Sequence, residues 1–138
     1  MARRSRAREV VLQLLYQRDH NDRVDPEEVR LFLRRRLRDK DLEAFAEGLY
    51  AGTVAHRDEI DRRLAAVAEN WTVERMAAVD RNILRLGAYE LLYQPDVPLR
   101  VAIDEAIELA KRYGTAESPA FVNGLLDRLA SARGTTKE

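Results

Sequence analysis

The chain contains 138 residues, and its 24 lysines and arginines are balanced by 24 aspartates and glutamates. This length predicts one domain with one hydrophobic core, and the absence of cysteine excludes disulfides, thiolate metal sites and cysteine nucleophiles. Because the net charge is zero, any attraction to nucleic acid must come from a local cluster of charge.

The first eight residues, MARRSRAR, hold four arginines and no acid. Mutual repulsion and the lack of large apolar side chains predict a flexible arm over residues 1–8. A guanidinium group binds phosphate through two hydrogen bonds and stacks on unpaired bases, so the arm is a candidate RNA contact. A solvated tail explains the same composition and stays open as the alternative.

Helical periodicity follows the arginines and continues to about residue 70. A first helix is predicted from about residue 7, and a second starts after Asp25, where an acidic cap precedes a proline and two glutamates. The clearest amphipathic helix is predicted over about residues 41–55, and a further helix ends near Asn70. These helices would form an N-terminal subdomain over about residues 9–70.

The second predicted helix carries arginines at four-residue steps on its polar side. Arg30, Arg34 and Arg38 share this side, with Arg35 and Arg36 beside them. Such side chains usually cover apolar surface with their methylene stems while the charge stays in water. A solvated face is the preferred interpretation, and a second basic contact surface is the alternative.

A long helix is predicted over about residues 79–93, after a short turn around residues 73–76. Its apolar residues lie on most sides, which predicts burial between two groups of helices. Gly87 lowers its helix propensity by up to about 1 kcal/mol relative to alanine. This cost is tolerable if another helix approaches closely there.

Two helices and a tight connector are predicted after the prolines at positions 95 and 98. The first is expected to end at Gly114 in a left-handed conformation. Ser118 and Pro119 are expected to start the second, with the serine hydroxyl capping free N–H groups that would face a phosphate. These helices would complete a C-terminal subdomain over about residues 71–130, followed by a frayed tail at 131–138.

The sequence contains neither the alternation of a strand nor a repeat, so it predicts an all-α fold of about seven helices, in two groups that share one core. No metal site is expected, because the two histidines have no partner ligand at helical spacing. No glycine-rich phosphate loop or nucleophile elbow is present either. We therefore expect no enzyme, no cofactor and no catalytic residue. No apolar run approaches the roughly 20 residues that span a bilayer, which predicts a soluble, cytoplasmic protein.

Three separated strings resemble the NusB family of transcription antitermination factors: RAREVVLQLLYQ after the first arginines, AVDRNILRLGAYELLY in the centre, and AIDEAIELAKRYG with FVNGLLD near the end. The resemblance implies an all-helical fold with two three-helix groups. It also implies a protein without catalytic activity that binds the boxA element of single-stranded nascent RNA. The implied partner is NusE, a protein of the small ribosomal subunit, within RNA polymerase antitermination complexes on ribosomal RNA operons.

The resemblance also implies which positions make contacts. Asp80 matches an acidic position associated with the NusE contact, and Ser5 stands where the family often has another arginine. We expect Arg8 to be exposed, so that its removal would weaken RNA binding without harming the fold. The positions assigned to RNA binding are Arg4, Arg6, Arg8, Tyr16, Glu117, Phe121 and Asn123.

Several alternatives stay open at this point. A helical adaptor that binds only proteins would keep the Asp80 surface but not depend on RNA. Some members of the family self-associate, and a homodimer could cover the RNA surface. A related helical domain occurs in ribosomal RNA cytosine methyltransferases, but the sequence has no G-x-G-x-x-G cofactor motif. A DNA-reading helix-turn-helix is disfavoured because the last helix presents apolar rather than base-reading side chains.

Overall fold

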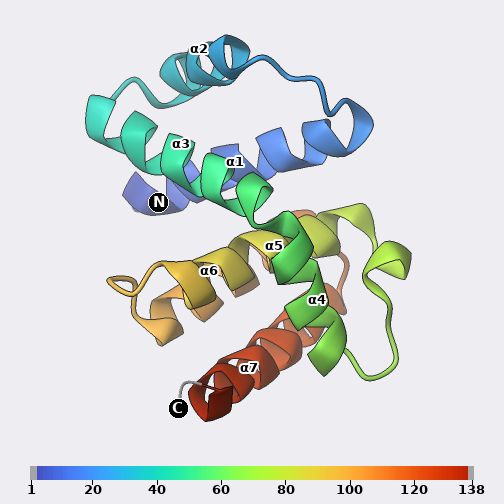
Figure 1. The fold of residues 1–138 in the computed structure, drawn as a ribbon. Coiled ribbons are helices and arrows are strands. Elements are labelled where there is room, and N and C mark those ends of the chain that lie inside the picture. Colours follow the sequence, from blue (N-terminus) through green and yellow to red (C-terminus); the bar gives the residue numbers. More distant parts are fainter. Residues whose placement is uncertain (1–2, 137–138) are drawn as a thin grey trace. The chain divides into compact units, whose positions relative to one another are not determined.

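The computed structural model of the protein describes residues 3–136. Within that range it contains seven α-helices, one 3₁₀ helix and no strand, which confirms the predicted all-α fold of about seven helices. The elements are α1 (Arg3–His20), α2 (Pro26–Leu37), α3 (Lys40–Ala55), α4 (Arg57–Val67), η1 (Val73–Arg75), α5 (Ala78–Tyr93), α6 (Leu99–Tyr113) and α7 (Ser118–Thr136) (Figure 1).

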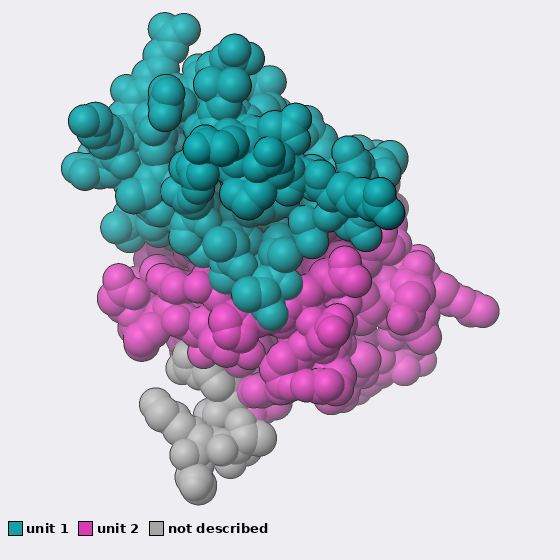
Figure 2. Space-filling model, turned by 45° about the horizontal axis from the view of Figure 1, so that its top comes forward, with its two compact units in different colours: residues 1–55 teal, residues 56–138 magenta. Residues whose placement is uncertain are grey.

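The chain divides into a first unit, residues 1–55, and a second unit, residues 56–138 (Figure 2). This boundary differs from the expected division near residue 70. The helix α4 belongs to the second unit because it packs against α5 and α7, with Ile60 and Leu64 fully buried. The second unit thus holds four α-helices instead of three. The polar stretch after α4 has the composition of a linker, whereas only His56 separates α3 from α4.

In the first unit, α3 packs against both α1 and α2. The start of α2 is the predicted one, since the Asp25 carboxylate accepts a hydrogen bond from the Glu27 N–H at 3.0 Å and the Glu28 carboxylate accepts one from the Asp25 N–H at 3.2 Å. The helix is followed by Arg38, whose φ of 55° is left-handed. That conformation costs a residue other than glycine about 1–2 kcal/mol.

The segment predicted as a flexible arm is helical in the structure, since residues 3–8 form the first turns of α1. Residues 1–2 lie outside the described range. Acidic partners within the first unit offset the repulsion among the arginines. One of them is Asp39, which accepts a hydrogen bond from the Arg3 guanidinium at 2.5 Å. This partner is 36 residues away, so the composition of residues 1–8 does not reveal it.

In the second unit, α5 packs against α4, α6 and α7. All residues from Asn82 to Leu91 are buried, in agreement with the apolar character of this helix on most sides. A Cβ atom placed on Gly87 would lie 2.9 Å from Leu126 Cδ1 and 3.4 Å from Ala106 Cβ. The prediction that Gly87 permits a close approach of helices is therefore confirmed.

The last helix extends further than predicted, because α7 continues to Thr136, whereas fraying was expected over residues 131–138. Residues 137–138 lie outside the described range. No proline follows Pro119, and each residue added to an existing helix forms one further hydrogen bond. The helix formed by the packed residues can therefore propagate into the tail.

Candidate nucleic-acid interface

The first turns of α1 carry an arginine cluster composed of Arg3, Arg4, Arg6 and Arg8, which we call the α1 arginine cluster. The exposed Arg4 places its guanidinium carbon 4.3 Å from the centre of the Phe45 ring on α3. A guanidinium group that stacks on an aromatic face keeps its N–H edges available for hydrogen bonds. Arg4 can therefore bind a phosphate while it remains on Phe45.

The structure contradicts the expectation that Arg8 is exposed, because only 3% of this residue is accessible. Arg8 follows Arg4 by one helical turn, so both side chains lie on the same side of α1. Its guanidinium carbon is 5.4 Å from the centre of the Phe45 ring. A buried Arg8 supports the packing beneath Arg4 and does not itself present N–H groups to a phosphate.

Arg6 and Tyr16 are accessible on α1. Arg6 donates a hydrogen bond to the Glu9 carboxylate at 2.7 Å, and its side chain is 42% exposed. Tyr16 is 41% exposed, with its ring centre 5.2 Å from that of His20. It follows Arg4 by about 18 Å along the helix axis, at about 1.5 Å per residue. Phosphate-binding groups followed by an exposed aromatic ring suit an RNA strand with unpaired bases.

Arg3 is held at the edge of the α1 arginine cluster by Asp39. The pKa of the Asp39 carboxyl lies below its usual range, first because the Leu42 N–H donates a hydrogen bond to it and then because of the Arg3 guanidinium. Both effects favour the carboxylate. The ion pair is therefore formed at neutral pH and is lost only when the pH falls through this lowered pKa.

The three C-terminal candidates lie at the start of α7. Glu117 is exposed and accepts a hydrogen bond from the Thr115 hydroxyl at 3.2 Å. Phe121 is half-buried and meets Trp71 edge-on, with 5.6 Å between ring centres. The side-chain oxygen of Asn123 is buried and has no hydrogen-bond partner among the described residues. Sequence reasoning overlooked Trp71, which is 54% exposed; its only signal was a large aromatic residue in a polar loop.

The connector before α7 differs from the prediction at two residues. Gly114 has a φ of −95°, which is not left-handed. A glycine is needed because a Cβ atom there would collide with the side chain of Ser118 and lie 2.9 Å from the Ala110 carbonyl oxygen. The Ser118 hydroxyl accepts a hydrogen bond from the Thr115 N–H at 2.9 Å. It therefore closes the connector and does not cap the N–H groups at the start of α7.

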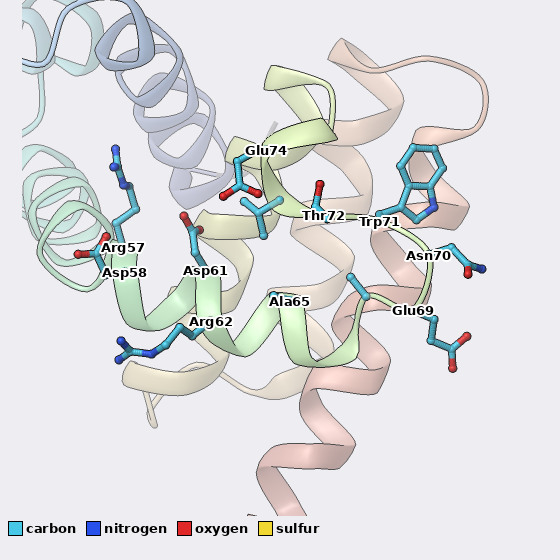
Figure 3. Close-up of a pocket in the computed structure, with 12 residues that line it drawn as sticks. Arg57, Asp58, Asp61, Arg62, Ala65, Glu69, Asn70, Trp71, Thr72 and Glu74 are labelled. Carbon is cyan, nitrogen blue, oxygen red and sulfur yellow. The ribbon is translucent and has the colours of Figure 1, made fainter.

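A broad hollow of about 900 Å³ lies between α4 and the segment that leads to η1, with Trp71 at one end and Arg57 at the other (Figure 3). One of its acids, Asp61, is already paired, since it accepts two hydrogen bonds of 2.9 Å from Arg85. Charges of both signs line an open space, which does not favour one class of small molecule. The charged lining residues are Arg57, Asp58, Asp61, Arg62, Glu69 and Glu74.

Other chemistry has little support in residues 3–136. No group of three or more histidine, aspartate and glutamate side chains in that range could hold a metal ion. No helix there has both the length and the apolar character needed to cross a membrane.

Asp80 is half-buried in the first turn of α5, where the positive end of the helix dipole stabilises a carboxylate. The structure thus groups Arg4, Arg6 and Tyr16 on α1 in the first unit, and Glu117, Phe121 and Asn123 at the start of α7 in the second.

Comparisons with known proteins converge on one family. The model of the NusB family matches residues 5–131. A transcription antitermination protein NusB from Thermodesulfovibrio yellowstonii is 43% identical, over 93% of this chain and 91% of its own length. The structure of T. maritima NusB is 40% identical, with a TM-score of 0.85 over 95% of this chain and 92% of that chain. A crystal structure of the antitermination factors NusB and NusE with double-stranded RNA is 27% identical, with a TM-score of 0.85 over 96% of this chain and 98% of that chain.

Proposed function

Because the chain belongs to the NusB family, we propose that it is a transcription antitermination factor that binds boxA-type single-stranded nascent RNA together with the ribosomal protein NusE. It would thereby promote antitermination on ribosomal RNA operons, within the RNA polymerase antitermination complex. The match to transcription antitermination proteins and to a solved complex of NusB, NusE and double-stranded RNA supports this role. We further propose that the protein acts in the cytoplasm, without catalytic activity or a cofactor.

The observation that carries the proposal is the α1 surface of the first unit. Arg4 rests on Phe45 at 4.3 Å while remaining exposed, and Arg6, two positions further along the same helix, is partly exposed. We assign the phosphate contacts to these two arginines and base stacking to Tyr16. Arg8 supports this surface from beneath, because it is buried.

We assign a second RNA contact to Glu117, Phe121 and Asn123. The exposed Glu117 carboxylate can accept hydrogen bonds from base amino groups, and the half-buried Phe121 ring can contact a base. The Asn123 side-chain oxygen is buried and lacks a partner among the described residues, so it can accept a hydrogen bond from RNA once a rotation of the side chain brings it to the surface.

We assign the NusE contact to the surface around Asp80. A half-buried carboxylate at the start of α5 favours a basic partner, because opposite charges across an interface select the partner and its orientation. Self-association through a homodimer would cover part of the RNA surface and would compete with this assembly.

Titration of a boxA-like oligonucleotide, with and without NusE, tests the proposal. Fluorescence anisotropy is measured against a scrambled single strand and a duplex of the same composition, at several salt concentrations. Binding to a single strand weakens with salt by a log–log slope of about −0.7 per neutralised phosphate, so the two assigned arginine contacts predict roughly −1.4. We expect the boxA-like strand to bind more tightly than both competitors when NusE is present.

Equal affinity for the boxA-like and the scrambled strands in the presence of NusE would contradict the proposal. If NusE still bound under those conditions, the protein would be an adaptor that recognises only proteins. An Asp80→Lys variant separates the two contacts: it should weaken NusE binding and leave the weaker RNA binding of the isolated protein unchanged.

A further inference from the structure

The C-terminal end of α2 and the first residue of α3 carry positive charge that their neighbours do not neutralise. Arg34, Arg35, Arg38 and Lys40, which we call the α2 basic patch, are all exposed. Within residues 3–136, none of these four side chains forms an ion pair with a carboxylate. The patch therefore presents four positive groups of the first unit to solvent.

The neighbouring arginines of α2 differ because they have partners. Arg30 lies 3.1 Å from the Glu27 carboxylate and 3.4 Å from that of Glu47. Arg36 stacks on the Phe32 ring at 4.2 Å and donates a hydrogen bond to the Gln13 side chain at 3.1 Å. The arginines that contact neither a carboxylate nor another side chain of α1 to α3 therefore lie towards the end of the helix.

The backbone at Arg38 provides a second, independent observation. Arg38 adopts a φ of 55°, and its N–H donates a hydrogen bond to the Arg34 carbonyl oxygen at 3.1 Å. A glycine would take this left-handed conformation without a steric cost. A left-handed residue is a common way for a helix to end, and residues other than glycine in this conformation are enriched at functional sites; Arg38 lies within the patch.

The patch is continuous with the α1 arginine cluster inside the first unit. Asp39, between Arg38 and Lys40 in the chain, accepts the hydrogen bond of 2.5 Å from Arg3. The start of α1 and the connector between α2 and α3 lie at the same end of this unit in Figure 1. A strand that passes from the α1 arginine cluster can therefore continue onto the patch.

We propose that the α2 basic patch binds the phosphate backbone of an RNA segment that flanks the segment held by the α1 arginine cluster. This inference rests on the proposed RNA-binding function and extends its ligand to a longer RNA. A nucleic acid fits better than a protein, because the only large apolar side chain of α2 that the structure shows as exposed is Leu31. One leucine does not provide the apolar centre of a protein interface.

The test compares two lengths of RNA on the protein bound to NusE. One is the boxA-like oligonucleotide, and the others carry about ten further nucleotides of mixed sequence on the 5′ or the 3′ side. One of the extended RNAs should make four further phosphate contacts. Relative to the short RNA, its log–log salt slope should be steeper by roughly 2 to 3, and its affinity at low salt should be higher on the order of tenfold. The patch variant, Arg34→Gln, Arg35→Gln, Arg38→Gln and Lys40→Gln, should lose this gain and bind the short RNA as the parent protein does.

The matched control removes three arginines and one lysine from exposed or half-buried positions of the second unit, through Arg62→Gln, Arg63→Gln, Arg100→Gln and Lys111→Gln. It changes the net charge equally and should keep the gain from the longer RNA. If both variants lost the tighter binding of the longer RNA equally, net charge alone would explain the effect and the inference would be overturned. A patch variant that keeps the gain, or that loses NusE instead of RNA, would also overturn it.

The single variant Arg38→Gly separates a functional from a structural role. Glycine relieves the backbone strain, so this variant should melt at a higher temperature and yet bind the extended RNA more weakly. A higher melting temperature with unchanged RNA binding would overturn the assignment of Arg38. If the parent protein binds the short RNA but gains nothing from either extension, this inference fails while the proposed function stands; if it binds neither RNA, both fail.

Discussion

At the scale of single residues, four arginines of one helical segment have four different environments. Arg3 pairs with Asp39, Arg6 pairs with Glu9 and Arg4 lies exposed on Phe45. Arg8 is buried. The same guanidinium chemistry can therefore bind phosphate at one position and support the packing at the next, because burial decides which N–H groups are available.

The pair Arg4→Ala and Arg8→Ala should separate binding from stability. Arg8→Ala removes a buried charged side chain and leaves its neighbours without their partner, which should lower the free energy of unfolding by on the order of 1–3 kcal/mol. Arg4→Ala changes an exposed residue and should lower RNA affinity with little effect on stability. Urea denaturation and RNA anisotropy on both variants check this. Equal free energies of unfolding for the two variants would show that the buried Arg8 side chain does not stabilise the fold.

Phe45→Leu should weaken RNA binding without unfolding the protein. Leucine keeps most of the apolar volume, but it has no aromatic face for the Arg4 guanidinium. A cation–π contact at an exposed site contributes about 0.5–1 kcal/mol, so RNA affinity should fall roughly two- to fivefold. Phe45→Tyr retains the aromatic face and should behave as the parent protein. Equal RNA affinity in the leucine and tyrosine variants would remove Phe45 from the binding surface.

At the scale of elements, the close approach of α5 to its neighbours in the second unit depends on a glycine, Gly87, which has no side chain. A Cβ atom at Gly87 would meet Leu126 on α7 and Ala106 on α6. Because all of α5 from Asn82 to Leu91 is buried, a displaced neighbour has little free space to occupy. Helix propensity alone would favour alanine at this position, and the packing opposes it.

Substitution of two helical glycines should give opposite results. Gly87→Val overpacks the contact of α5 with α6 and α7 and should lower the free energy of unfolding by about 1–3 kcal/mol. Gly48→Ala, in α3, places its Cβ where no atom lies within 4 Å, and it should raise stability by roughly 0.5–1 kcal/mol. Thermal denaturation checks both. Destabilisation by Gly48→Ala would mean that helix propensity does not govern that site.

At the scale of the whole molecule, a net charge of zero conceals an uneven distribution along the chain. Residues 1–40 hold 12 basic and 7 acidic side chains, so from the totals of 24 and 24 the remaining 98 residues hold 12 basic and 17 acidic ones. The first forty residues therefore carry a formal charge of +5 and the rest −5. An anionic RNA and a basic protein partner can be attracted to different parts of one neutral chain.

The sequence alone determined the features that depend on neighbouring residues. Apolar periodicity located the helices, Asp25 and Glu28 marked the start of α2, and three strings placed the chain near its family. Gly87 also followed from local reasoning, because a glycine within a helix that is apolar on most sides needs a close neighbour to be tolerated. Each of these signals lies within a few turns of chain, where spacing and capping chemistry are sufficient.

Only the tertiary structure decided which charged groups face solvent and where the units divide. Arg4 and Arg8 meet Phe45, and Arg3 meets Asp39 at 36 residues' separation, so neither the helical start of α1 nor the burial of Arg8 could be read from local composition. The unpaired charge of the α2 basic patch emerged in the same way, once Arg30 and Arg36 were seen to have partners. Contacts between residues distant in the chain set burial and ion pairing, and the choice between a structural arginine and a phosphate-binding one depends on both.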